Sequence, residues 1–239
     1  MTIEELKEEV YEQNLELVNR NLVIYTWGNV STIDREREII IIKPRGIECK
    51  LLKPVDMSVV DLNGNMVEEG LLPSVDLDIH LELYKAFEEI GGIAHTHSTY
   101  ATAYAQSLKS ICPMGTTHAD HFKGAIPCVP YLSEKKIEGD YEKNLGLQIV
   151  SYFQSNKIDP IEMEGVLAGG HGPFTWGRDA KESVMHSVIL EEIAKIAMLT
   201  ELIAQKEILL PGYIQKKHYE RKYGPSAYFY QEKKDGENY

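Results

Sequence analysis

The chain has 239 residues, of which 43% are hydrophobic and 26% charged, a composition typical of a globular protein that can bury a core without disulfides. Its formal net charge of −12 argues against nucleic acid as a partner, because phosphate binding needs a basic surface. The three cysteines have no CxxC spacing and no apolar run reaches membrane-spanning length, so we expect a protein of the reducing cytoplasm with no membrane partner.

The first half of the chain mixes helical and extended patterns. Apolar residues recur on a helical period over 3–20, which predicts an amphipathic helix, too acidic to be a signal peptide. The β-branched run at 38–46 predicts a strand, and the Asn-Gly pair within 61–70 is typical of a tight hairpin. A second helix is predicted at 79–90, ended by two glycines, and a strand at 93–97.

The second half continues with a short helix after Ser98, a plausible N-cap. The proline-interrupted segment 126–132 predicts an edge strand, and 140–155 a helix. Residues 164–177 predict a strand, a glycine-rich loop and a hairpin, and 180–206 the longest helix. Strands and helices do not alternate as in a parallel doubly wound sheet, so we predict one α/β domain with a largely antiparallel or mixed sheet.

Two histidines follow one apolar run in "GGIAHTHSTYATAYA". In a strand, His95 and His97 would point to the same face, roughly 6–7 Å apart, so both rings could bind one cation. The same pattern also fits two polar residues at the end of a strand, and the pair alone does not decide between these interpretations.

Two further residues would complete a metal site. His171 lies in "AGGHGPFTWG", where glycines allow close approach of the backbone, although an isolated histidine there is more often a turn residue. Asp76 precedes a predicted helix, where an N-cap or first-turn acid is the simpler interpretation. Together with the histidine pair, these residues offer the neutral imidazoles and carboxylate that a catalytic zinc-type ion prefers.

Seven segments carry a resemblance to a known family: "LVIYTWGNVS", "IIIKPRG", "PSVDLDIH", "GGIAHTHSTYAT", "GTTHAD", "GVLAGGHGPFTWG" and "KHYERKYGPSAY". In their order and spacing the chain resembles the class II aldolase/adducin-head family, and within it the L-ribulose-5-phosphate 4-epimerase type. The resemblance implies a single three-layer α/β/α domain over 1–231 with a largely antiparallel central sheet. The tail 232–239 is predicted to be disordered. The family resemblance also implies a cyclic homotetramer with active sites at subunit interfaces.

The resemblance implies that Asp76, His95, His97 and His171 bind a divalent metal, most often zinc, with Mn²⁺ or Co²⁺ as alternatives. The family reaction is a retro-aldol cleavage of the C3–C4 bond of a sugar phosphate. The metal acts as a Lewis acid on the ketose oxygens. The released aldehyde turns over, and recombination inverts the configuration at C4. The chain is therefore predicted to be an isomerase of carbohydrate metabolism.

Proton transfer is where this sequence departs from the family. The first proton-transfer group maps to Asp120. The second is a tyrosine, and its position is occupied by Phe229, which cannot transfer a proton. Tyr228 or Tyr230 is left as a candidate replacement. An aldolase that releases the aldehyde is therefore an alternative to an epimerase.

The predicted substrate pocket matches the family at Gly28, Asn29, Gly46 and Ser74, whose amides and hydroxyl suit a phosphate. Two serines of the family pattern are replaced by Arg45 and Val75, which suggests a different anionic sugar as a second alternative. Weaker candidates for the pocket match the family pattern: Lys43, Thr116, Glu142, His218 and Arg221.

Two alternatives remain outside this enzyme class. An adducin-head-like assembly module would keep the fold without catalysis, but it has no need of a complete ligand set. A cupin also uses an HxH motif, but the helical periods at 79–90 and 184–203 argue against an all-β fold. His80, His121 and His186 lie outside the catalytic motifs and are assigned no role.

Overall fold

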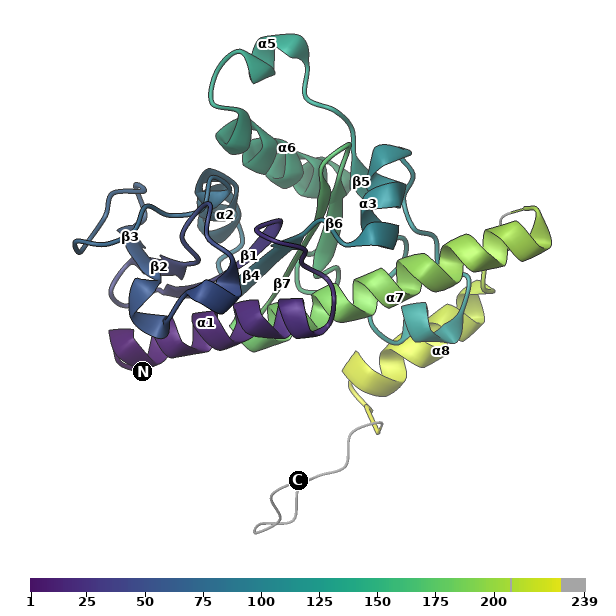
Figure 1. The fold of residues 1–239 in the computed structure, drawn as a ribbon. Helices are drawn as coiled ribbons and strands as arrows, with labels where there is room; N and C mark the ends of the chain where they lie inside the picture. The colour runs from purple at the N-terminus through teal and green to yellow at the C-terminus, as the bar shows by residue number, and fades with distance from the viewer. Residues whose placement is uncertain (207, 229–239) are drawn as a thin grey trace.

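A computed structural model of the chain describes residues 1–206 and 208–228 (Figure 1). Within these residues the centre is a seven-stranded sheet in the order β3-β2-β1-β4-β7-β6-β5. Only the β5–β6 pair is parallel, so the predicted single α/β domain with a largely antiparallel sheet is confirmed.

One end of the sheet is formed by β1 (Gly28–Asp34), β2 (Ile39–Ile42) and β3 (Ser58–Asp61). The four consecutive isoleucines of β2 are all buried because both faces of the sheet are covered. Ile40 and Ile42 belong to the core cluster beneath helix α2 (Leu77–Ala86), whereas Ile39 and Ile41 pack with residues of α1 (Ile3–Asn19). This run therefore divides its side chains between two layers of helices.

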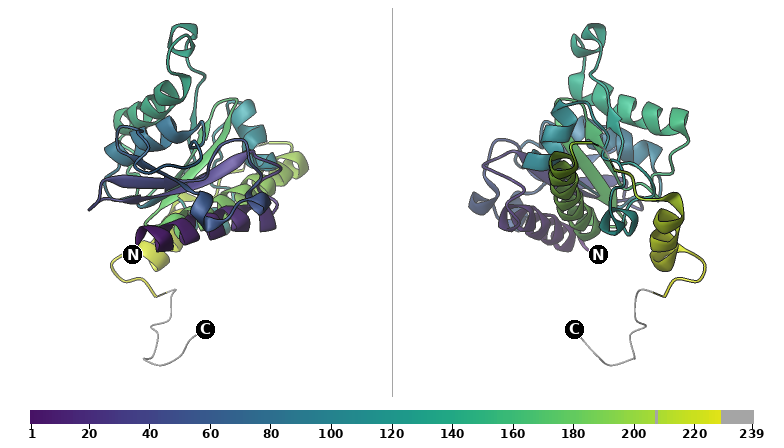
Figure 2. Two further views of the ribbon diagram at one scale, coloured as in Figure 1. Left: turned by 60° about the vertical axis from the view of Figure 1, so that its left-hand side comes forward. Right: turned by 90° about the vertical axis from the view of Figure 1, so that its right-hand side faces the viewer.

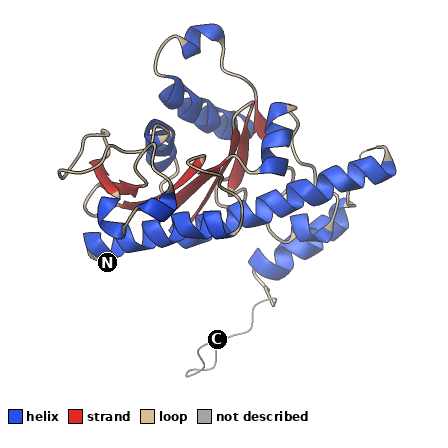
Figure 3. Ribbon diagram, viewed as in Figure 1, coloured by secondary structure: helices blue, strands red, loops and turns tan. Residues whose placement is uncertain are grey.

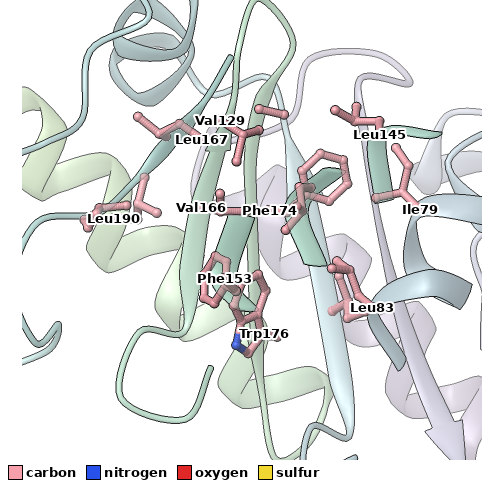
Figure 4. Packing of buried hydrophobic residues seen from close by; sticks show 14 of the residues in the cluster. Ile79, Leu83, Val129, Leu145, Phe153, Val166, Leu167, Phe174, Trp176 and Leu190 are labelled. Carbon is pink, nitrogen blue, oxygen red and sulfur yellow. The ribbon is translucent and has the colours of Figure 1, made fainter. Parts of the chain in front are cut away.

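The other end of the sheet contains β4 (Gly92–Thr96), β7 (Gly172–Gly177), β6 (Gly165–Ala168) and β5 (Cys128–Val129). Trp176 of β7 is fully buried here and packs against Phe153 of helix α6 (Tyr141–Asn156), with ring centroids 5.4 Å apart. Figure 4 shows these rings beside Val166 and Phe174 in the main core cluster. As predicted, β5 is a short strand at the edge of the sheet.

Helices cover both faces, which confirms the three-layer arrangement (Figures 1 and 2). Helices α1 and α7 (Ala180–Ala204) run along one face, and α2 and α6 (Tyr141–Asn156) lie on the other. The remaining short elements are mostly at the periphery (Figure 3): η1 (Cys49–Leu51), η2 (Pro54–Asp56), α3 (Thr99–Gln106), α4 (Thr116–Ala119), α5 (Glu134–Ile137) and α8 (Gly212–Tyr223). No helix in the described ranges combines the length and apolar character needed to cross a bilayer.

The predicted end of the second helix was wrong. Helix α2 ends at Ala86, several residues before Gly91, although Phe87 and Ile90 remain buried. The glycines instead allow close packing of the chain, because a Cβ on Gly91 would lie 2.0 Å from the carbonyl oxygen of Arg178. The predicted tail 232–239, with Phe229 and Tyr230 before it, lies outside the described residues.

Candidate metal centre and substrate cavity

His95 and His97 are placed at the end of a central strand. His95 is the fourth residue of β4, opposite Asn29 of β1 and Phe174 of β7, and its side chain is buried. His97 follows the last residue of the strand and is exposed. Their ring centroids lie 5.0 Å apart, so the strand end presents both imidazoles together.

His171 reaches the same point from the turn that joins β6 to β7. Its ring centroid is 4.7 Å from that of His95 and 5.1 Å from that of His97. The adjacent Gly172 makes this approach possible, because a Cβ there would lie 2.6 Å from the carbonyl oxygen of Thr96. One ligand atom from each of the three histidines lies within 4.8 Å of the others, so this trio could hold a metal ion.

The protonation of the trio suits a metal. Burial, and next the neighbouring imidazoles His171 and His97, lower the pKa of His95 well below its usual value. Partial desolvation of its ring also lowers the pKa of His97, and burial lowers the pKa of His171. The three rings are therefore neutral near pH 7, as metal ligands must be.

Hydrogen bonding leaves ligand atoms available. His95 Nδ1 lies 2.9 Å from the carbonyl oxygen of Pro173 and donates to it, so His95 Nε2 carries a lone pair. His95 Nε2 and His171 Nδ1 are buried and have no hydrogen-bond partner among the described residues. Buried orphaned nitrogens are costly unless a ligand satisfies them. These atoms fit a divalent cation.

Asp76 stands at the N-terminal end of α2, next to this trio. Its Oδ2 accepts a hydrogen bond of 2.7 Å from Asn29 Nδ2 and a longer one of 3.4 Å from Ser74 Oγ. Its charge raises the pKa of His97 and of His171, against the larger effect of burial. Asp76 is therefore close enough to act on these rings electrostatically, although it is not part of the compact histidine group.

A cavity of about 260 Å³ opens beside the trio. It contains Asp76, His97 and His171 together with most of the predicted substrate residues: Gly28, Lys43, Arg45, Gly46, Ser74 and Val75. Asn29 is linked to it through hydrogen bonds to Ser74 and Asp76. The structure thus brings the predicted substrate residues of three separate segments to the metal candidates.

The positive charge of the cavity is carried by two basic residues at different depths, opposite in sign to the Asp76 carboxylate. Lys43 is only 3% exposed and donates a 3.2 Å hydrogen bond to the carbonyl oxygen of Pro44. Burial lowers its pKa, while Cys49 and Asp76 act in the opposite direction. Arg45 is exposed at the mouth, beside Val75. The cavity can therefore attract an anion from solvent and hold it.

Asp120 and Thr116 are not among the residues that line this cavity. Asp120 follows α4 and accepts hydrogen bonds from two residues of α8: His218 Nδ1 at 3.0 Å, and Arg221 Nε at 2.9 Å and Nη2 at 2.6 Å. Burial alone would raise the pKa of Asp120, but these hydrogen bonds lower it overall. Asp120 is thus held as a carboxylate against α8.

Tyr228, one of the two tyrosine candidates, does not line the cavity either. Tyr228 is 62% exposed, and Lys217 Nζ lies 5.1 Å above its ring. Tyr230 lies outside the described residues. Within one chain, the structure therefore groups the predicted metal and substrate residues but keeps Asp120 and Tyr228 apart from them.

Two aromatic residues at the site were missed from the sequence. Trp27 lines the cavity and is half exposed, and its position beside Gly28 in "TWGNVS" was the available signal. The Tyr141 ring lies 6.3 Å from that of His171, and burial raises the pKa of its phenol. The only sequence signal near Tyr141 was its neighbour Glu142, which had been predicted as a weak candidate for the pocket. In the structure the charge of Glu142 raises the pKa of His171, against the larger effect of burial.

Comparison with known proteins adds to this geometry. The family model described as the class II aldolase and adducin N-terminal domain matches residues 8–198. Among solved structures, an L-fuculose 1-phosphate aldolase is 26% identical with a TM-score of 0.78, covering 91% of this chain and 95% of that one.

A second solved structure is YgbL from Klebsiella pneumoniae, whose assignment as an aldolase, epimerase or decarboxylase is itself provisional. It is 25% identical with a TM-score of 0.72, covering 91% of this chain and 99% of that one. An L-fuculose-1-phosphate aldolase from Thermus thermophilus is 22% identical with a TM-score of 0.66, covering 84% and 98% of the two chains, and shows the fold alone.

Proposed function

The chain belongs to the class II aldolase and adducin N-terminal domain family, and we propose that it is a metal-dependent sugar-phosphate 4-epimerase of the L-ribulose-5-phosphate type. The observation that carries this proposal is the meeting of three neutral imidazoles beside a cavity with two basic residues. The reaction would be reversible retro-aldol cleavage of the C3–C4 bond, followed by recombination on the other face of the aldehyde.

In this proposal His95, His97 and His171 hold the metal, and Asp76 supplies a fourth, oxygen ligand. Three histidines and one carboxylate suit Zn²⁺, with Mn²⁺ or Co²⁺ as alternatives. A divalent cation bound there would stabilise the negative charge that develops on the substrate oxygens as the carbon–carbon bond opens.

The cavity would bind the anionic end of the sugar. Lys43 supplies a buried positive charge, and Ser74 and the backbone at Gly28 and Gly46 supply smaller polar contacts. Both glycines have positive φ angles, of +151° and +72°, which side chains rarely adopt. Arg45 adds a second charge at the mouth, so a sugar with a different anionic group is the alternative substrate class.

Proton transfer to and from the C4 hydroxyl oxygen would involve Asp120, with Tyr228 or Tyr230 as the second group. Since Asp120 lies outside the cavity of its own chain, we propose that a second copy supplies it, in a homotetramer with active sites at subunit interfaces. Support comes from the exposed apolar side chains of α7 that a subunit contact could cover: Ile196, Leu199, Leu202 and Ile203.

The same geometry supports an aldolase as the second candidate. Phe229 stands where the family pattern has a proton-transferring tyrosine, and the 26% identical relative is an L-fuculose 1-phosphate aldolase. An enzyme that cannot complete recombination on the second face would release the aldehyde. Cys49 and Cys128 are free thiols, which supports a cytoplasmic location for either activity.

An NMR assay distinguishes these candidates. The metal-loaded protein is incubated in D₂O with a panel of ketose phosphates and sugar acids, including L-ribulose 5-phosphate. Inversion at C4 without uptake of solvent deuterium at C4 supports the epimerase, and accumulation of a free aldehyde supports the aldolase. A folded protein that binds no metal and turns over nothing on the panel would favour an assembly module and overturn the proposal.

A further inference from the structure

His80 of α2 is a buried histidine that the proposed reaction does not use. It has no exposed surface, and its Nδ1 lies 2.7 Å from Ser31 Oγ. Ser31 Oγ also lies 2.8 Å from Tyr84 Oη, so the three side chains form one hydrogen-bonded chain. The other ring nitrogen, His80 Nε2, has no partner among the described residues.

The hydrogen-bonded chain determines which nitrogen carries the proton. His80 Nδ1 can accept a hydrogen bond from Ser31 Oγ only if Nδ1 itself carries no proton. If Tyr84 donates to Ser31 and Ser31 donates to His80 Nδ1, the imidazole proton is on Nε2. The reverse order would leave the Tyr84 hydroxyl proton without an acceptor in the described part of the chain. The first order therefore makes His80 Nε2 a buried donor that lacks an acceptor.

His80 is also close to two proposed metal ligands. It is four residues after Asp76, and its backbone N–H bonds the Asp76 carbonyl oxygen at 3.3 Å, so the two side chains share one face of the helix start. Its ring contacts Phe174 edge-on at 6.1 Å, and Phe174 stacks on His95 at 4.1 Å. Asp76 and His95 both interact electrostatically with His80.

An acceptor is available on Asp76. Its Oδ2 is bound by Asn29 and Ser74, whereas no hydrogen bond is formed by Oδ1 within the described ranges. We propose that His80 is a positioning residue of the metal centre, which donates a hydrogen bond from Nε2 to the Asp76 carboxylate when that carboxylate binds the metal. This inference rests on the proposed function. Such a contact would fix the carboxylate and strengthen metal binding.

The test measures metal affinity and coordination, independently of activity. His80→Phe keeps an aromatic ring in the buried site but removes both nitrogens, and His80→Gln restores a donor near the Nε2 position. Zinc dissociation constants are measured by competition with a chromogenic chelator, and the Co²⁺ absorption spectrum reports on coordination. Loss of an outer hydrogen bond to a ligand weakens metal binding by about 10–100-fold. We expect that loss in His80→Phe, an altered Co²⁺ spectrum, and partial recovery in His80→Gln.

His118 offers a matched control. It is also buried, has one bonded nitrogen (Nε2 to the Gly124 carbonyl oxygen, 2.7 Å) and one without a partner in the described part of the chain, and contacts Phe122 edge-on at 6.1 Å. His118→Phe therefore makes the same substitution at a buried histidine outside the proposed metal centre. Its metal affinity should remain at the wild-type value.

The outcomes separate the inference from the proposed function. Wild-type affinity and an unchanged Co²⁺ spectrum in a folded His80→Phe protein would overturn the role of His80 alone. A wild-type protein that binds no zinc would overturn both. If His80→Phe does not fold, His80→Leu replaces it, because leucine also suits a buried site and has no hydrogen-bonding group. Weaker zinc binding by His80→Leu supports the role, and unchanged binding contradicts it.

Discussion

Replacing His97 with alanine separates metal binding from folding. His97 is exposed and follows the last residue of β4, whereas His95 is buried and stacks on Phe174. Truncating an exposed side chain usually changes the free energy of unfolding by no more than about 0.5 kcal/mol. The metal-free His97→Ala protein should therefore be about as stable as the metal-free wild type, and any difference should arise only when zinc is added.

The size of that difference follows from linkage. Zinc at 100 times the wild-type dissociation constant stabilises the folded state by about 2.7 kcal/mol. For a chain of this length each kcal/mol raises Tm by about 2–4 °C, so zinc should raise wild-type Tm by roughly 5–11 °C. Loss of one ligand should weaken binding by at least about 100-fold, which at the same zinc concentration leaves about 0.4 kcal/mol, or roughly 1–2 °C.

Differential scanning calorimetry with and without zinc provides the measurement. His121→Ala is the control, because His121 lies outside the histidine trio, and it should keep the full zinc-dependent increase whatever its metal-free Tm. A full increase of Tm in His97→Ala would show that zinc binds elsewhere, and would refute the assignment of this site.

Three further changes address proton transfer, substrate choice and pH. Phe229→Tyr should raise the rate of L-ribulose 5-phosphate epimerisation in the NMR assay if the missing phenol limits the reaction, and an unchanged rate would point to a different substrate. Arg45→Ser should change the ratio of kcat/KM between sugar phosphates and sugar acids, and equal ratios across the panel would make Arg45 irrelevant to specificity. Burial, with a smaller effect of Glu182, raises the pKa of Glu164 to about 8, and its Oε2 lies 3.2 Å from His186 Nε2. Between about pH 5 and pH 8, Glu164 therefore keeps its proton in the folded chain but loses it in the unfolded chain. The stability that protonated Glu164 contributes is thus lost as pH rises through this range. Urea denaturation should show a shallower fall in unfolding free energy over this range in Glu164→Gln, and parallel profiles would contradict the shift.

Much of the fold could be predicted because its patterns are local. The isoleucine run predicted β2, and the helical period over 180–206 predicted α7, which ends at Ala204. The end of α2 could not be predicted, since Gly91 serves packing against Arg178, a residue distant in the sequence. A contact between segments so far apart leaves no local signal, whereas a glycine after an apolar helix normally indicates a helix end.

The histidines of the site could be predicted from the sequence, but the contacts around them could be predicted only in part. The HxH motif and the glycine-flanked His171 pointed to the trio, which depends on the close approach of Gly172 to Thr96. His80 received no role from its sequence position, because its environment consists of side chains from other elements, Ser31 and Phe174 among them.

The most direct test of the account is X-ray absorption spectroscopy of the zinc-loaded protein. The account predicts one zinc ion per chain with three imidazole nitrogens at about 2.0–2.1 Å and a carboxylate oxygen at about 2.0–2.2 Å. The imidazole contribution should fall from three to two in His97→Ala, measured at a zinc concentration that still fills the site. A spectrum with fewer than three imidazoles in the wild type, or one unchanged by His97→Ala, would contradict the account.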